Sequence, residues 1–221
     1  MIVSLDDAYA RGLLLLPARD GAGRLAGLDI IARYPVSIPP PNDITLFKLQ
    51  LALVERAALF FTRRGLTAWI PINEAVARTL LADAALMENA LRFPFLALKV
   101  SEKVAGSSSA SAVLEHLKSA FPLVLADFGA GDAPASALFS GLFSAAVFDA
   151  GFIHRQLPLP SFTPVMRALM AQITPAVDAV MVSGVDSDAM LAALAPWPFD
   201  AMQGALWPAV GVETLTQLVQ E

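Results

Sequence analysis

The feature that most restricts the possible folds is a regular alternation of strand-like and helix-like segments. Apolar runs of strand length are followed by helical patterns about six times in succession, an order that implies a parallel sheet. The expected strands cover residues 13–16, 25–34, 66–72, 93–100, 122–127, 145–152, 178–185 and part of 199–208. For 221 residues, closure into an α/β barrel fits better than an open sheet. No boundary divides the chain, so we expect a single domain over residues 1–221.

The expected helices carry their own start and stop signals. Asn42 or Asp43 can cap a long helix that should end near Gly65. Four prolines between residues 35 and 41 exclude a helix or an interior strand just before it. Further helices are expected at 73–92, 134–143, 165–173, 187–195 and 212–220. Residues 101–113 should contain a polar loop, followed by a helix that ends at about residue 120, and residues 158–164 should form another loop.

Composition excludes several classes of site. The chain has no cysteine, which rules out disulfides, thiolate zinc sites and cysteine nucleophiles. The two histidines, His116 and His154, lie far apart in sequence, and we expect the first on the polar face of a helix and the second in a loop. The net charge is −5 and the basic residues are scattered, so nothing indicates binding to nucleic acid.

A mean hydropathy of +0.60 makes a membrane segment worth testing. The longest weakly charged stretch, residues 133–148, is too short to span a bilayer. The first ten residues contain two aspartates, where a signal peptide needs basic residues. We therefore expect a cytoplasmic protein with a large core and some exposed apolar surface, which often marks a partner site.

Residues 124–134, VLADFGAGDAP, could open a phosphate-binding turn. A dinucleotide site needs Gly-x-Gly-x-x-Gly between a strand and a helix, with an acid about twenty residues on. Gly129, Gly131 and Asp149 meet that spacing, but Pro134 replaces the third glycine and the unit lies in mid-chain. Dinucleotide binding is therefore a minor alternative, and the plainer interpretation is a tight turn.

Six segments, in the right order, resemble the EAL family of cyclic di-GMP phosphodiesterases. They are GLDIIARY, LKVSE, ADFGAGDAP, VFDAGFI, SGVDS and MQGALWP. The resemblance implies a modified TIM-type (β/α)8 barrel with one antiparallel strand. Active members of the family hold metal ions through carboxylates and an asparagine at the strand ends, and the metals activate water against a phosphodiester.

The same resemblance implies that most of this machinery is lost. The metal asparagine falls at Pro71, a metal glutamate at Lys99 and the first of two paired aspartates at Ala126. The catalytic lysine falls at Val147 and the proposed base at Ser183. Lys99 has the wrong sign for a ligand, because a unit charge about 4 Å from a divalent ion is repelled by about 8 kcal/mol at an effective dielectric near 20.

A few polar positions of the family pattern survive. Asp29 stands for the glutamate of the naming motif, Asp127 is the second of the paired aspartates, and Asp149 follows the lost lysine. Asp186 stands for the second glutamate of its segment and Gln203 matches the late glutamine. On this resemblance the VLADFGAGDAP stretch is the relic of a metal site, with no metal or cofactor expected.

The segments RFPFLAL, LADFGAG, GLF and QGALWP narrow the resemblance to the degenerate EAL proteins of the YdiV type. Those proteins bind the FlhD subunit of the flagellar master regulator FlhDC, block its DNA binding and help to deliver it to the ClpXP protease. The resemblance implies a non-catalytic regulator with an FlhD-type partner. Two alternatives stay open: a cyclic di-GMP receptor that does not cut, with Arg33 among its contacts, and a weak phosphodiesterase using the surviving aspartates.

Overall fold

Eight strands form a closed barrel in the computed structural model, which describes residues 9–131 and 141–219. β1 (Leu13–Arg19) runs antiparallel to both its neighbours, β2 (Leu25–Ala32) and β8 (Ala201–Gln203). Every other neighbouring pair is parallel. The other strands are β3 (Thr67–Ile72), β4 (Leu96–Ser101), β5 (Leu123–Phe128), β6 (Ala145–Phe148) and β7 (Ala179–Ser183). The expected barrel with one antiparallel strand is confirmed.

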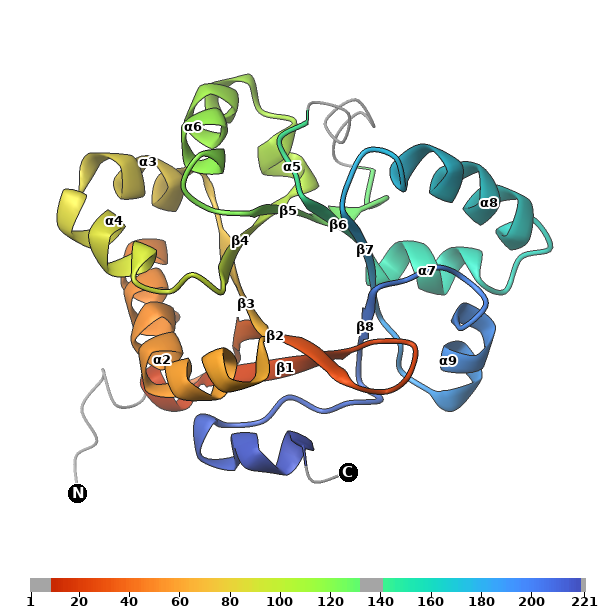
Figure 1. The fold of residues 1–221 in the computed structure, drawn as a ribbon, viewed down its shortest axis with the longest axis horizontal. Helices are drawn as coiled ribbons and strands as arrows, with labels where there is room; N and C mark the ends of the chain where they lie inside the picture. The colour runs from red at the N-terminus through yellow and green to blue at the C-terminus, as the bar shows by residue number, and fades with distance from the viewer. Residues whose placement is uncertain (1–8, 132–140, 220–221) are drawn as a thin grey trace.

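Helices surround the barrel on its outside (Figure 1). They are α2 (Asp43–Arg64), α3 (Glu74–Ala82), α4 (Ala84–Leu91), α5 (Glu102–Ala105), α6 (Ser108–Lys118), α7 (Ala150–Gln156), α8 (Phe162–Ile173) and α9 (Asp188–Leu194), with the 3-10 helix η2 (Val212–Val219) at the end. Within residues 9–131 and 141–219, no helix has the length and apolar character needed to cross a membrane.

The longest helix, α2, begins and ends where the sequence signals predict. The Asn42 side chain accepts a hydrogen bond from the backbone N–H of Thr45, which satisfies one of the free donors of the first turn. At the other end Gly65 adopts φ 62°, a left-handed conformation that glycine reaches without steric cost. Its N–H bonds back to the carbonyls of Phe61 and Thr62.

Two apolar layers hold the barrel together. Side chains on the outer strand faces, such as those of Ile30, Leu98 and Phe148, are fully buried beneath the helices. The alternate residues face the bore, which is filled by a separate cluster of mostly small side chains: Ala18, Trp69, Ala97, Val124, Ala145, Val147, Met181 and Ala201. This alternation follows from the two-residue period of a strand.

Trp69, the largest side chain of the bore cluster, depends on a glycine across the strand pair. A Cβ atom added at Gly27 would lie 2.3 Å from the Trp69 ring and 2.7 Å from the Thr67 carbonyl oxygen. Gly27 therefore provides the space that the Trp69 indole fills.

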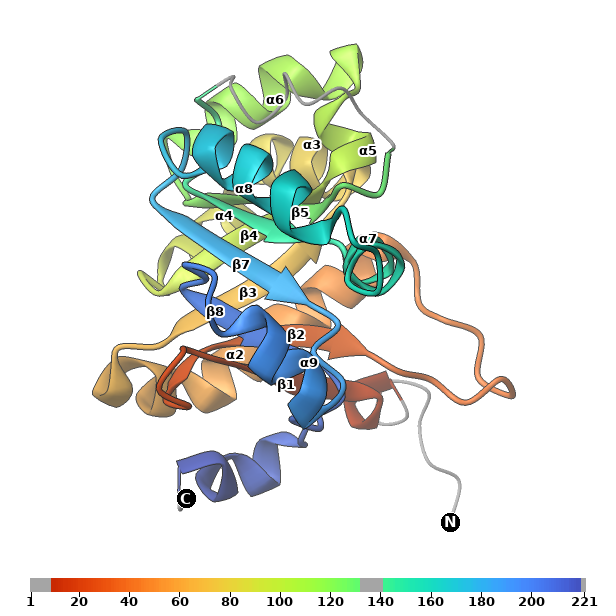
Figure 2. The same cartoon turned by 90° about the vertical axis from the view of Figure 1, so that its right-hand side faces the viewer.

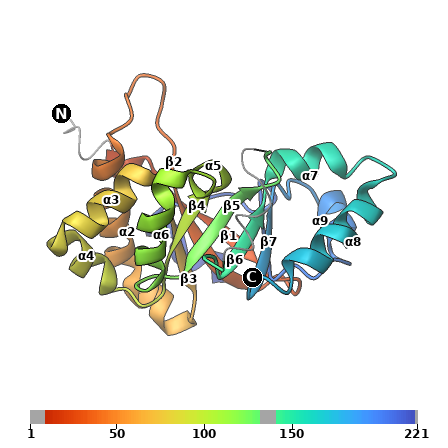
Figure 3. The ribbon, with the colours of Figure 1, turned by 90° about the horizontal axis from the view of Figure 1, so that it is seen from above.

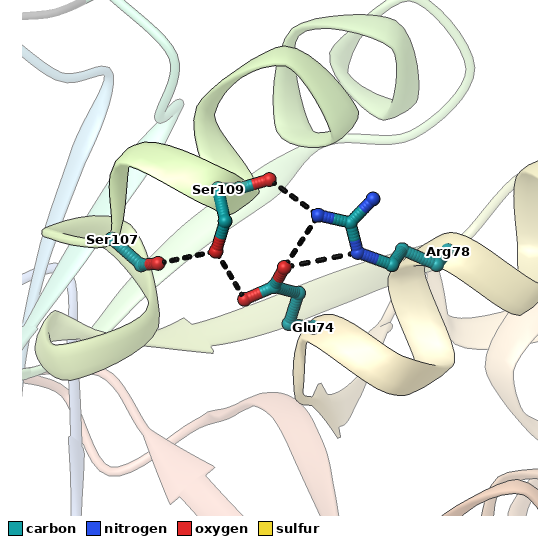
Figure 4. A network of polar contacts seen from close by, with 4 residues as sticks. All are labelled: Glu74, Arg78, Ser107 and Ser109. Atoms are coloured by element: carbon teal, nitrogen blue, oxygen red, sulfur yellow. Dashed lines mark hydrogen bonds and ion pairs between the residues drawn. The ribbon is translucent and has the colours of Figure 1, made fainter.

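A polar network joins α3 to α6 on the outside of the barrel (Figure 4). Arg78 donates to the Glu74 carboxylate at 2.6 Å and to the Ser109 carbonyl at 2.7 Å. The Ser109 hydroxyl donates to the other Glu74 oxygen at 2.8 Å and contacts the hydroxyl of Ser107. These bonds lower the pKa of Glu74, with the bond from Arg78 as the largest cause.

The proline-rich segment projects from the barrel. Residues 33–42 leave at the end toward which β2 and β7 point (Figure 2), and the view from above shows the same loop standing clear of the helices (Figure 3). Val36 is fully exposed there. We call this end of the barrel, where the parallel strands finish, the mouth.

Two segments differ from expectation because an aspartate interrupts them. Residues 73–92 form two helices, since Asp83 ends α3 and its side chain accepts from the N–H of Leu86 to begin α4. The expected strand at 145–152 stops at Phe148, because Asp149 caps α7. His154 therefore lies in a helix and not in a loop.

Smaller corrections concern loops and ends. The expected loop within 101–113 contains α5 and the start of α6, and α8 begins inside the expected loop 158–164. The strand expected at 25–34 ends at Ala32, and the last helix has 3-10 geometry. Most of the helix expected at 134–143 lies outside the described residues, and residues 141–143 are not helical. His116 is exposed on α6, as predicted.

Candidate functional site

Seven of the predicted positions form one layer at the mouth. Each position follows, two residues later in its strand, a residue that faces the bore. Because side chains alternate between the two faces of a strand, these positions also face inward, and they lie nearer the mouth. This mouth layer consists of Asp29, Pro71, Lys99, Ala126, Val147, Ser183 and Gln203. In the register, Pro71 pairs with Lys99 and Ser183 with Gln203. At three other strand pairs the layer is staggered by two residues, since Asp29 pairs with Trp69, Lys99 with Val124 and Val147 with Met181, as the tilt of barrel strands requires.

A buried ion pair occupies the layer. The Lys99 ammonium donates to Oδ2 of Asp29 at 2.5 Å, and the two residues are 8% and 5% exposed. The amide of Gln203 donates to the same carboxylate oxygen at 3.4 Å and to the Ser183 hydroxyl at 3.0 Å. Four strands, β2, β4, β7 and β8, thus meet in one hydrogen-bonded group.

This donor set does not suit a divalent cation. The Asp29 carboxylate is already bonded to the ammonium of Lys99, whose positive charge would repel a second cation. Pro71, Ala126 and Val147 bring no side-chain donor atom to the layer. Among the residues that the structure describes, no group of three or more His, Cys, Asp and Glu could hold a metal ion.

The other three predicted aspartates lie beyond the strand positions that form this group. Asp127 is exposed and has φ 59°, a left-handed conformation for a residue with a side chain. The Asp149 carboxylate accepts from the N–H of Phe152 at 2.6 Å. Asp186 accepts from the N–H of Ala205 at 2.7 Å and lies 3.2 Å from the His154 ring. The structure therefore brings Asp29 together with Lys99, Ser183 and Gln203, and leaves these three carboxylates at the rim.

The glycine-rich stretch makes a turn that holds a carboxylate. Gly129 and Gly131 both have φ 91°, which favours glycine. The N–H of Gly131 donates to the buried carboxylate of Glu102 at 3.1 Å. A phosphate would need that N–H, so this part of the turn gives no support to a dinucleotide site. The helix expected to follow lies mostly outside the described residues.

Sequence reasoning did not single out Glu102, although it ends the LKVSE segment. It is 4% exposed and lies directly after β4. The signal in the sequence that could have identified Glu102 is its place, directly after a predicted interior strand. Arg33 lies at the base of the projecting loop and is exposed, away from the bonds of the mouth layer.

Known proteins resemble the chain over its full length. It is 41% identical over 236 aligned positions to the anti-FlhC(2)FlhD(4) factor YdiV of Salmonella arizonae, with all of both chains covered. The chain belongs to the YdiV family. A scan of family models finds no match to this YdiV-family chain.

Solved structures agree with that assignment. The crystal structure of the EAL-like domain protein YdiV is similar with a TM-score of 0.85 and 33% identity, covering 95% of this chain and 96% of the other. A PaMucR phosphodiesterase in complex with c-di-GMP is similar with a TM-score of 0.76 at 18% identity, covering 92% and 93%. The second likeness shows the fold alone. The barrel of this YdiV-family chain is thus the EAL-like barrel expected from its six segments.

Proposed function

We propose that this YdiV-family chain is a non-catalytic, protein-binding regulator that represses flagellar gene expression by acting on FlhDC. Relatives that align over their whole length carry the name anti-FlhC(2)FlhD(4) factor, which states the complex that they oppose. In this proposal the whole chain acts as one domain in the cytoplasm. It contacts an FlhD-type subunit, and delivery of that subunit to ClpXP is a later step.

The observation that carries the non-catalytic part is the Lys99–Asp29 pair. Metal-dependent phosphodiester hydrolysis needs a cation that polarises the phosphate and lowers the pKa of a bound water. Here an internal ammonium holds the one carboxylate found in the described mouth layer. The Ser183 hydroxyl, at the position of the proposed base, accepts a hydrogen bond from the amide of Gln203.

A fold that carries no chemistry can still present a binding surface, because function depends on sites and not on the barrel itself. A specific interface needs about 1,200 Å² or more in total. Five large apolar side chains among the described residues are exposed: Val36, Leu59, Leu81, Leu91 and Leu159. Leu59, Leu81 and Leu91 lie on α2, α3 and α4, so these outer helices can supply apolar contacts, and Val36 adds one on the loop at the mouth.

The test is co-purification with FlhDC from the same organism, followed by a gel-shift titration on a flagellar promoter. We expect one stable complex by size exclusion and loss of the FlhDC–DNA band as the protein is added. Separate elution at micromolar concentration, with the DNA band intact, would refute the anti-FlhDC function.

The same preparation tests the two competing functions. We expect no linear product from cyclic di-GMP with magnesium or manganese, and product formation that Asp127→Ala abolishes would establish a phosphodiesterase. We also expect weak cyclic di-GMP binding or none. A dissociation constant near or below about 1 μM by calorimetry would instead favour a receptor.

A further inference from the structure

The end of the barrel opposite the mouth contains a cavity lined by four arginines. Arg19, Arg24, Arg63 and Arg64 line a volume of about 500 Å³. They come from three places: the end of β1, the hairpin that leads into β2, and the last turn of α2. Figure 2 shows the hairpin, the end of α2 and the C-terminal turns together at the end of the barrel away from the projecting loop.

This concentration of charge is unusual for the chain. The net charge is −5, yet four of its fifteen basic residues meet at one cavity. No acidic residue lines that cavity within residues 9–131 and 141–219. The adjacent acid is Asp20, which pairs with Arg24 at 2.8 Å and so offsets one of the four charges.

Two of the arginines are held in place and two are available. The Arg19 guanidinium donates to the carbonyls of Gly23 at 2.8 Å and Leu218 at 3.2 Å, which fixes it between the hairpin and η2. Within the described part of the chain, neither Arg63 nor Arg64 makes a hydrogen bond or an ion pair through its side chain. Arg64 lies over the Phe60 ring at 5.3 Å.

The helix dipole does not explain the whole arrangement. Basic residues in the last turn stabilise a helix, which accounts for Arg63 and Arg64 on α2. It does not account for Arg19 and Arg24, which reach the same cavity from a strand end and a hairpin. Arg19 and Arg24 already have protein partners, so an anionic ligand would bond to Arg63 and Arg64 and be attracted by the nearby charge of the other two.

We propose that this cavity binds a phosphate-bearing small molecule of about nucleotide size. Guanidinium groups match phosphate oxygens in a two-pronged geometry and keep their charge at any physiological pH. Small-molecule sites span about 300–1,000 Å³, a range that includes this cavity. The site lies at the opposite end of the barrel from the mouth. The proposal does not depend on whether the chain binds FlhDC.

The probe is inorganic tripolyphosphate, titrated into the full chain by calorimetry at about 0.15 M salt, where surface charges are well screened. We expect a dissociation constant below about 100 μM. The double variant Arg63→Ala/Arg64→Ala should bind at least tenfold more weakly. These side chains are exposed, so the variant should fold, which circular dichroism and its unfolding midpoint will verify.

The matched control is Arg155→Ala/Arg167→Ala, which removes the same charge from exposed positions on α7 and α8 and should bind as the parent does. Citrate, a carboxylate anion of similar charge, should bind at least tenfold more weakly than tripolyphosphate. The proposal is overturned by an absence of tripolyphosphate binding, by equal losses in the two double variants, or by citrate binding as tightly.

Discussion

At the scale of single residues, the mouth layer buries two opposite charges together. Asp29 and Lys99 are each less than 10% exposed, and Gln203 bonds to the shared carboxylate oxygen. Removing one member of such a pair leaves the other charge uncompensated, which costs about 3–5 kcal/mol, whereas removing both is often nearly neutral.

Lys99→Met should therefore lower the free energy of unfolding by about 3–5 kcal/mol. The double variant Asp29→Asn/Lys99→Met should recover most of that loss. Urea unfolding of both variants measures the difference, with Lys103→Met, an exposed lysine on α5, as the control. A single variant as stable as the parent would mean that the ion pair does not form.

Gly27 tests the packing of the bore. A methyl group there meets Trp69 and the Thr67 carbonyl, so Gly27→Ala should destabilise the protein by about 1–3 kcal/mol through overpacking. Gly21→Ala is the matched change, since a Cβ at Gly21 has nothing within 4 Å. Equal unfolding midpoints for the two variants would show that the indole can move aside.

At the scale of elements, the network between α3 and α6 makes stability depend on pH. The pKa of Glu74 is lowered by its hydrogen bonds from Arg78 and then Ser109, so the ionised form is favoured in the folded state. The stabilisation is complete above the ordinary pKa of 4.5 and is lost as the pH falls through the lower folded value.

Glu74→Gln should accordingly reduce stability at pH 7, and its difference from the parent should shrink as the pH falls below about 4.5. Urea midpoints at pH 7 and pH 3 measure this, with Glu88→Gln on α4 as an exposed control. A difference that is the same at both pH values would exclude the carboxylate as its source.

The elements that could be predicted are those whose signals are local. Asn42 and Gly65 fix the ends of α2, and the alternation of segments fixes the barrel. The sequence does not predict that Asp83 ends one helix and begins the next, or that Asp149 ends a strand and begins a helix. In each case the aspartate can equally be a polar residue on the solvent face of one longer element. Only the three-dimensional structure shows each one accepting a bond from an N–H three residues on.

At the scale of the whole molecule, a metal that binds only the folded state would raise the unfolding temperature. We expect no rise with millimolar magnesium or manganese beyond that of sodium chloride at equal ionic strength, because Lys99 already neutralises Asp29. Differential scanning fluorimetry provides the measurement. A metal-specific rise that disappears in Asp29→Asn would show that the mouth still holds a cation.

Once the six segments are matched, the two-residue strand period puts the seven mouth-layer positions on the inward faces of their strands. The sequence does not predict that Lys99 bonds to Asp29, because the two are 70 positions apart and only closure of the barrel brings them together. The sequence does not predict the arginine cavity either, because its four arginines come from two separate parts of the chain and only folding brings these parts together.

The Lys99–Asp29 pair also bears on how such a protein can evolve. Pro71 or Ala126 could regain a ligand side chain without touching the pair, but any intermediate that replaces Lys99 leaves the buried Asp29 carboxylate without its counter-charge. Each such intermediate would be less stable before it gained any activity. Under the non-catalytic function proposed above, this loss of stability would work against the recovery of a metal site.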